Sequence, residues 1–380
     1  MEKSKSILIV AGEASGDQHA AYLVKEIKRL DANVVFWGLG GDRLAAEGIP
    51  VRTDLVSLAV IGFSEVLKHL STIRAVYKQL LSDIDRKKPD IAILVDYPGF
   101  NLQLAKELKK RAIPVIYYVS PQVWAWGKGR VKTIRDTVSR MIVFFPFEET
   151  LYRQNRIPVS FVGHPSLDQV RPGKTAQEFR SIFSLDPSKR TIGLLPGSRQ
   201  KEVKTLLPVM LETARLISQD CASRVQFIVL AAPSVPADMI SSIVKEHGVP
   251  VTIVNNMTYD GIAASDFCLV CSGTATLETG ILGTPMVILY KVNFLTWLYL
   301  RLLIKIPYIG LVNVVAGKKI SEEFIQYDAQ PRAIASYCKA VLTNTTRLAS
   351  LRKDLETMKR ALGDKGASAR AAQAVMEFLR

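Results

Sequence analysis

The chain has 380 residues, roughly two to three times the usual length of one domain, so we expect two compact domains. Hydrophobic residues make up 48% and charged residues 22%, a balance that excludes a disordered chain and predicts a large buried core. The 50 Lys and Arg residues exceed the 35 Asp and Glu residues by 15, which favours an anionic partner, either nucleic acid, a phosphorylated small molecule or an anionic membrane. A crowded, solvated surface is the alternative, and charge alone does not choose among these.

The start of the chain and its cysteines indicate a reducing compartment. The run Ile7 to Ala11 is too short for the apolar region of a signal peptide, so we expect a cytoplasmic protein. Cys268 and Cys271 have CxxC spacing, but they lie in an apolar run without a second pair, which is typical of a buried strand rather than a zinc or redox site. The histidines are scattered without ligand spacing, so we predict no metal and no cofactor.

Short β-branched runs alternate with helical patterns, which predicts an α/β fold of two doubly wound units with parallel sheets. Strands are expected at 7–11, 34–37, 91–95, 115–119, 141–145 and 159–162, and again at 191–195, 227–231, 252–254, 267–271 and 286–289. Turn residues at 163–165 and 171–174 predict a linker. We therefore expect domains at 1–168 and 169–335, with a helical segment at 336–380 that packs back on them. Ligands of such sheets bind at the carboxyl ends of the strands, so we expect both sheets to face one central cleft.

The first strand ends in a glycine turn that leads into a helix. Glycines there let backbone amides approach a ligand at a helix N-terminus. The GxxxG spacing, without a following GKS or GKT, excludes a Walker loop and weakens a dinucleotide fingerprint. A plain tight turn is the alternative, but Glu13, Asp17 and His19 crowd into the same turn, which favours a functional role. The turn residues are Gly12, Ser15, Gly16 and Asp17.

Asp96 directly follows the expected buried strand at 91–95, at the carboxyl end of the sheet. A carboxylate at that place can act as a general base on an acceptor hydroxyl. The alternative is that Asp96 caps the helix that starts near Phe100. Asp83 and Asp85 match the DxD of metal-dependent sugar-nucleotide enzymes, but they lie in a helical run and indicate a solvated helix end.

Two turns in the second half share one design: a strand, small polar residues and a helix start. The first turn carries Arg199, whose guanidinium beside exposed amides suits a diphosphate, although a helix cap with an incidental arginine is the alternative. In the second turn, Glu278 about one turn into the helix could accept both hydroxyls of a ribose. Together they predict a nucleotide diphosphate site. The candidate residues are Gly197, Ser198, Arg199, Gln200, Ser272, Gly273, Thr274, Ala275, Thr276 and Glu278.

Two apolar regions flanked by bases predict a surface for anionic lipid. Residues 55–64 are uncharged, and apolar residues then recur at helical spacing to Leu80, a pattern that a core-facing helix also shows. Residues 281–320 contain bases but no acids, and their uncharged stretch at 292–300 is too short for a bilayer span of about 20 residues. Aromatic motifs of nucleic-acid modules are missing, so no nucleic-acid partner is expected. The lipid-surface candidates are Val56, Leu58, Val60, Ile61, Phe63, Val66 and Leu67.

Five motifs resemble lipid-A-disaccharide synthases, in order and over essentially the whole chain: VAGEASGD at 10–17, DYPGFN at 96–101, SPQVWAW at 120–126, LPGSR at 195–199 and SGTATLE at 272–278. The resemblance implies a GT-B glycosyltransferase of lipopolysaccharide synthesis on the cytoplasmic face of the bacterial inner membrane. It implies the substrates UDP-2,3-diacylglucosamine and 2,3-diacylglucosamine 1-phosphate, and the products UDP and a β-1,6 disaccharide. It also implies that Asn313 lines the site and that the protein is a homodimer.

On this hypothesis Asp96 deprotonates the acceptor 6-hydroxyl for in-line attack with inversion, and Glu13 is the competing base. Arg199 and the helix start near Ser272 stabilise the departing UDP in place of a metal. Two alternatives stay open. A UDP-sugar 2-epimerase shares the fold but does not need the lipid surfaces, and a non-catalytic peripheral lipid-binding protein leaves the turns of Arg199 and Glu278 without a role.

Overall fold

The computed structural model describes residues 4–54, 63–124, 129–221, 224–293, 297 and 306–379, with only the backbone described at 52–54, 63–70 and 220–221. The chain divides into two compact units. The first consists of Met1–Pro165 together with Gly363–Arg380, and the second of Ser166–Leu362.

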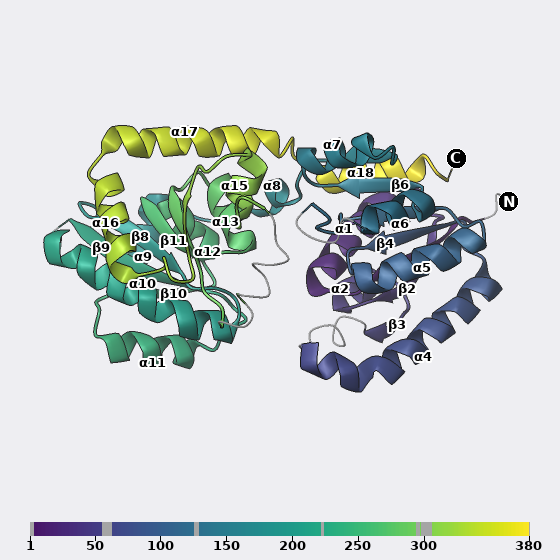
Figure 1. The fold of residues 1–380 in the computed structure, drawn as a ribbon, viewed down its shortest axis with the longest axis horizontal. Helices are drawn as coiled ribbons and strands as arrows, with labels where there is room; N and C mark the ends of the chain where they lie inside the picture. The colour runs from purple at the N-terminus through teal and green to yellow at the C-terminus, as the bar shows by residue number, and fades with distance from the viewer. Residues whose placement is uncertain are drawn as a thin grey trace. The chain divides into compact units, whose positions relative to one another are not determined.

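The first unit is built on a parallel sheet of seven strands in the order β3-β2-β1-β4-β5-β6-β7 (Figure 1). The central strands β1 and β4 are continuous apolar runs because helices cover both faces of the sheet. Leu8 of β1 lies between Trp37 of β2 and Ala92 of β4. The strands are β1 Ser6–Ala11, β2 Val35–Gly40, β3 Val51–Asp54, β4 Ile91–Val95, β5 Val115–Tyr118, β6 Arg140–Val143 and β7 Val159–Phe161.

Alternate side chains of these strands enter two separate cores. Ile7 and Ile9 pack with the helices α1 and α18 on one face, whereas Leu8 and Val10 pack with α4, α5 and α6 on the other. The helices are α1 Ala14–Leu30, α2 Asp42–Ala46, α4 Phe63–Lys87, α5 Pro98–Lys110, α6 Arg130–Thr137, α7 Pro146–Gln154 and α18 Ala367–Met376.

The second unit repeats the plan with six parallel strands in the order β10-β9-β8-β11-β12-β13 (Figure 1). Its strands are β8 Arg190–Leu195, β9 Val225–Ala231, β10 Thr252–Asn255, β11 Phe267–Cys271, β12 Met286–Tyr290 and β13 Glu322–Ile325. Its helices are α8 Ser166–Gln169, α9 Ala176–Ile182, α10 Gln200–Cys221, α11 Ala237–His247, α12 Thr258–Ala264, α13 Thr274–Ile281, α15 Leu311–Ala316, α16 Pro331–Leu342 and α17 Thr345–Ala361.

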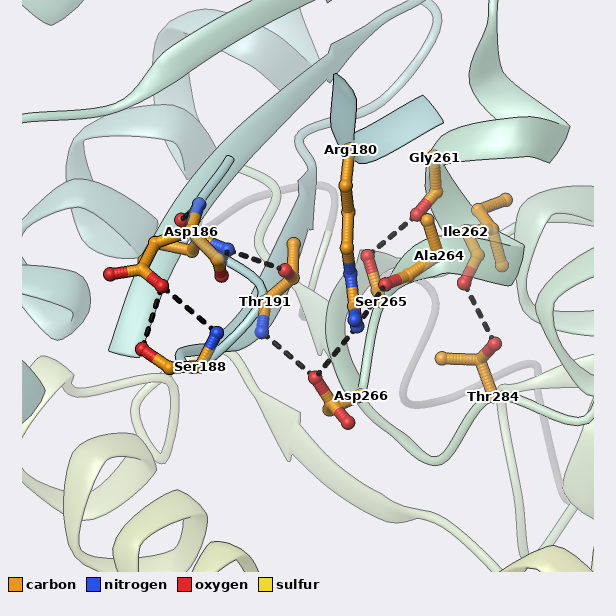
Figure 2. A network of polar contacts seen from close by, with 11 residues as sticks. Arg180, Asp186, Ser188, Thr191, Gly261, Ile262, Ala264, Ser265, Asp266 and Thr284 are labelled. Carbon is orange, nitrogen blue, oxygen red and sulfur yellow. Dashed lines mark hydrogen bonds and ion pairs between the residues drawn. The ribbon is translucent and has the colours of Figure 1, made fainter. Parts of the chain in front are cut away.

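A polar network ties together the amino ends of β8, β9 and β11 (Figure 2). Asp266 accepts a hydrogen bond from the amide of Thr191 at 2.9 Å and pairs with Arg180 of α9 at 3.7 Å. Gln226 donates to the hydroxyl of Thr191 at 3.0 Å and to the carbonyl of Asp186 at 2.9 Å. These bonds hold the amino ends of the three neighbouring strands in place, and thereby also help to position their carboxyl ends.

The predicted α/β class with two parallel sheets is confirmed. The sequence missed β3 and β13, which pair with one neighbour each and so do not need a continuous apolar run; β13 begins with Glu322 and Glu323. The units meet at Pro165 and Ser166 rather than at 168/169. The helical segment expected at 336–380 is not one body, because α16 and α17 belong to the second unit and α18 to the first.

Candidate functional site

In the second unit, a cavity of about 630 Å³ lies at the carboxyl ends of β8, β9 and β11. Its size falls in the range of small-molecule sites. Both predicted turns contribute to its wall, although they are more than 70 residues apart in the sequence, because β8 and β11 are neighbours in the sheet. The predicted residues that line it are Gly197, Ser198, Arg199, Ser272, Gly273, Thr274, Ala275 and Glu278.

Glu278 lies on α13 and is held by a tyrosine that the sequence analysis did not single out. The Tyr259 hydroxyl donates to Glu278 Oε1 at 3.1 Å, and both residues line the cavity. Burial raises the pKa of Glu278, and the hydrogen bond from Tyr259 partly offsets this. Burial and the neighbouring carboxylate raise the pKa of Tyr259. Tyr259 lies at the start of α12, just after β10. It therefore occupies a third turn between a strand and a helix, like the turns of Arg199 and Glu278, and this position is the signal that predicts it.

The amides at the start of α10 are not free, which corrects the expectation for this turn. Glu202 Oε2 accepts from the amides of Ser198 and Arg199 at 3.1 and 3.2 Å, and Oε1 pairs with the Arg199 guanidinium at 2.8 Å. Gly197 has a φ of +119°, and a Cβ there would lie 2.6 Å from Glu202 Oε2, so the turn requires glycine. The Arg199 side chain is 80% exposed. Gln200 is exposed at the first position of α10 and is not part of the wall.

The start of α13 is more open. No side chain caps it, and space beyond the Gly273 Cα is empty to 4 Å. The amide of Thr276 donates to the Gly273 carbonyl at 3.1 Å, whereas the amides of Thr274 and Ala275 have no acceptor among the described residues. Thr276 is buried and donates to the carbonyl of Gly273 at 2.8 Å, so it shapes the turn instead of lining the cavity. Ser272 donates to the carbonyl of Ile309 at 3.3 Å. This helix start, more than that of α10, suits a bound phosphate.

Asn313 on α15 does not line this cavity, in contrast to the role that the resemblance implied. It is fully buried. Its Nδ2 donates to the Ser321 carbonyl and to Glu323 Oε1, both at 2.8 Å, and its Oδ1 accepts from the amides of Ile320 and Ser321, both at 2.9 Å. Within the described residues its hydrogen bonds therefore connect α15 to β13 and to the two residues that precede this strand.

In the first unit, Asp96 stands in a strained turn after β4. Asp96 and Tyr97 have φ values of +48° and +46°, which are unfavourable for residues other than glycine. The buried Asn101 donates to the carbonyls of Val95 at 3.1 Å and Asp96 at 2.8 Å, and the Tyr117 hydroxyl donates to the Asp96 carbonyl at 2.6 Å. The residue at the cap of α5 is Tyr97, without a side-chain cap, so the helix-cap interpretation of Asp96 is wrong.

The electrostatic environment of Asp96 suits a proton acceptor. The pKa of Asp96 is raised to about 6, chiefly by burial and also by the negative charge of Glu13, while the hydrogen bond from the Tyr97 amide opposes the rise. Glu13 is exposed at the start of α1. A Cβ on Gly12 would lie 2.2 Å from Cδ1 of Tyr97, so this glycine admits the tyrosine ring of its own chain. Gly16 makes ordinary contact with Asp96 Cβ, at 3.7 Å from an added Cβ, and Ser15 is exposed.

Asp17 and His19 differ from what the glycine turn predicts. Asp17 is buried and caps α2, because its carboxylate accepts from the amides of Gly41 at 2.8 Å and Arg43 at 2.9 Å. It is therefore a structural residue. Burial lowers the pKa of His19 to about 4, so its imidazole is neutral at neutral pH. His19 Nδ1 has no hydrogen-bond partner in the described part of the chain, and its ring packs against Phe144 with centroids 5.1 Å apart.

The predicted lipid surface at residues 56–67 lies at and before the start of α4. Val56, Leu58, Val60 and Ile61 lie outside the described residues, as do the side chains of Phe63, Val66 and Leu67 at the start of α4. The second half of α4 packs into the core through Leu80 and Ile84, as the alternative of a core-facing helix predicts. Among the helices of the described ranges, none combines the length and apolar character that crossing a membrane requires.

Comparisons with known proteins give the family. The family model described as lipid-A-disaccharide synthetase matches residues 7–378. The chain belongs to this family. Family members named lipid-A-disaccharide synthase from Syntrophus aciditrophicus and Geobacter sulfurreducens are 44% and 42% identical, each over 99% of this chain and 98% of the relative. The family member from Myxococcus xanthus is 40% identical over 100% of this chain and 99% of its own length.

Solved structures give the fold of this family member as GT-B. A glycosyltransferase from Rickettsia africae has a TM-score of 0.56 at 11% identity, covering 100% of both chains. UDP-GlcNAc 2-epimerase from Neisseria meningitidis, bound to UDP-GlcNAc, has a TM-score of 0.59 at 12% identity, covering 98% of this chain and 99% of that one. At such identities only the fold is shared. The family comprises glycosyltransferases of lipid A biosynthesis that condense UDP-diacylglucosamine with lipid X, the diacylglucosamine 1-phosphate.

Proposed function

We propose that the second unit binds UDP-2,3-diacylglucosamine through its cavity, and that the first unit supplies Asp96 as the base that activates 2,3-diacylglucosamine 1-phosphate. The observation that carries the proposal is the meeting of three strand-end turns at one cavity of about 630 Å³. A helix start, a guanidinium and a tyrosine-held carboxylate together are the groups that a nucleoside diphosphate needs.

The diphosphate binds at the start of α13, where the amides of Thr274 and Ala275 have no acceptor among the described residues. Arg199 exchanges its exposed pair with Glu202 for the diphosphate, which costs little because surface ion pairs are weak. Glu278 accepts from the ribose hydroxyls, and Tyr259 fixes its orientation. The start of α13 and the Arg199 guanidinium stabilise the negative charge that develops on UDP as it leaves, so the reaction proceeds without a metal.

In the transfer step, the oxygen at position 6 of the acceptor forms a bond to C1 of the donor sugar as the bond from C1 to the diphosphate breaks. The proton of the 6-hydroxyl passes to Asp96, and the electron pair of the broken bond leaves with UDP. Attack opposite the leaving group inverts C1 and gives the β-1,6 linkage. A pKa of about 6 makes Asp96 ionised at neutral pH and a stronger base than an ordinary carboxylate. Glu13 is the competing base.

The protein acts as a peripheral protein on the cytoplasmic face of the bacterial inner membrane, held by anionic phospholipid, and forms a homodimer. The net charge of +15 and the apolar residues between Val56 and Leu67 support the membrane part. Co-sedimentation with anionic vesicles should weaken as salt is raised, because ions screen the attraction. Sedimentation velocity measures the oligomeric state.

The experiment that tests the function uses the purified full chain with both acylated substrates. Release of UDP together with a disaccharide 1-phosphate supports the proposal. The Glu278→Ala variant should bind UDP more weakly in calorimetry, and the exposed Glu246→Ala change on α11 is its control. Epimerised UDP-sugar in place of disaccharide, or UDP binding that survives Glu278→Ala unchanged, would contradict it.

A further inference from the structure

A second cavity, of about 460 Å³, lies in the first unit between α4 and the start of α5. The two helices run beside each other in Figure 1, and the rings of Tyr77 and Phe100 join them at a centroid distance of 5.3 Å. Bases and aromatic rings line this cavity, and no acid does among the residues whose side chains the structure describes. It is separate from the nucleotide cavity, and none of the roles assigned above uses it.

Two bases stand on its α4 side. Arg74 and Lys78 are one turn apart, so their side chains project from the same face of the helix. Both are exposed, and neither makes an ion pair or hydrogen bond with any residue that the structure describes. Glu107 of α5, whose charge acts on Tyr77 of this wall, is already paired with Lys110 at 2.6 Å and Arg111 at 3.0 Å. The two bases are therefore available to an anion from outside the chain.

A row of aromatic rings leads from these bases to Asp96. Tyr77 meets the edge of Phe100, and Phe100 stacks on Tyr97 with centroids 6.0 Å apart. Tyr97 directly follows Asp96, and its ring covers Gly12. A ligand on this row thus has its anionic end at Arg74 and Lys78 and its other end at Tyr97, the residue next to Asp96.

We propose that this cavity binds the phosphorylated acceptor, with the phosphate monoester between Arg74 and Lys78 and the sugar and first methylenes on the aromatic row. The inference rests on the proposed function, because the identity of the acceptor comes from it. The acceptor carries its phosphate and its reacting hydroxyl at opposite ends of one sugar ring, so an anion receptor must stand at a distance from the base. A guanidinium fork and an ammonium suit the doubly charged monoester. The cavity thus recognises a phosphate on a molecule that also bears acyl chains, and an anionic phospholipid combines the same two features.

The test compares the R74A/K78A variant with wild type on two acceptors, 2,3-diacylglucosamine 1-phosphate and the same molecule without its phosphate. For the phosphorylated acceptor we expect kcat/KM to fall about 10- to 100-fold, the loss typical of charge-assisted hydrogen bonds. For the dephosphorylated acceptor and for UDP affinity we expect no change. K106A/K109A, which removes two exposed bases of α5 outside the cavity, should match wild type on both acceptors.

An equal loss on both acceptors would overturn the phosphate assignment, because it would mean that the bases support the fold. A loss confined to binding of anionic phospholipid vesicles, with kcat/KM for both acceptors intact in detergent, would also overturn it and assign the bases to the membrane. Titration of the phosphorylated acceptor in neutral-detergent micelles, without donor, separates the two proposals. If wild type binds it and R74A/K78A does not, the acceptor site stands even where no disaccharide forms and the proposed function fails.

Discussion

Replacing Asp96 with Asn removes the proposed base while keeping the shape of the side chain. We expect turnover to fall about 10²- to 10⁴-fold, the range for a positioned general base. UDP affinity should stay the same, because the nucleotide cavity belongs to the other unit. The backbone turn should persist, since Asn101 and Tyr117 bind the carbonyl of residue 96 and not its side chain.

The pH dependence gives the magnitude from the structure. With a pKa of about 6, Asp96 is mostly ionised at pH 7 and only about one tenth ionised at pH 5. The rate of the wild type should therefore fall about tenfold per pH unit below pH 6 and be flat above it. Glu13→Gln removes a like charge, so the pKa of Asp96 should fall and the acid limb should move to lower pH. Initial rates of UDP release from pH 4.5 to 8.5 measure both.

The pH dependence of thermal stability reports the protonation of Asp96 independently of the reaction rate. The folded pKa of Asp96 lies above its unfolded value of 3.8, so the fold disfavours the ionised form. The resulting destabilisation is absent below about pH 4, grows through pH 6 and is complete above it. Asp96→Asn should thus unfold at a higher temperature than wild type at pH 8, and the difference should vanish near pH 4. A fully active Asp96→Asn enzyme, or a Glu13→Gln enzyme that is dead at every pH, would refute the assignment of the base.

Three further predictions follow from single contacts. Tyr259→Phe should weaken UDP binding about 5- to 10-fold in calorimetry, the loss expected for one hydrogen bond to a carboxylate, here Glu278, while acceptor KM is unchanged. Asp17→Ala should lower the free energy of unfolding by about 1 to 3 kcal/mol in urea titrations, because it leaves buried amides at the start of α2 without an acceptor. Burial raises the pKa of Glu148 to about 8, so wild type should lose stability as pH rises from about 4.5 to 8; Glu148→Gln should remove that loss in thermal unfolding.

The strand-end turns could be predicted because their position follows from the order of strands and helices alone. Arg199 and Glu278 were found in this way, and a parallel sheet then brings both to one edge. The partners of such residues could not be predicted, because they depend on contacts between distant segments. Tyr259 meets Glu278 across 19 positions, and the carboxylate of Asp17 caps a helix 24 positions further along the chain.

Two predictions about strand-end turns differ from the structure, and in the first of them the cause lies only three residues away in the sequence. Glu202 stands three positions after Arg199, at the spacing of a side chain that folds back on a helix start, and its charge occupies the amides that were expected to be free. In the first unit, the glycine turn at Gly12 predicts a close approach of a ligand to the backbone, yet the group that approaches it is the ring of Tyr97. A glycine reports that something comes close to the backbone, and the sequence alone does not say whether that is a ligand or another side chain.

The last helix has a consequence for how the protein is made. Ala371, Ala372 and Val375 of α18 are buried with the central strands of the first unit, although more than 190 residues separate them from Pro165. During synthesis this helix leaves the ribosome after the whole second unit, so the amino-terminal half emerges with α1 but without α18 on that face of its sheet. That half should mature only after α18 has been translated, and a nascent chain stalled after Leu362 should stay sensitive to protease and bound by chaperones.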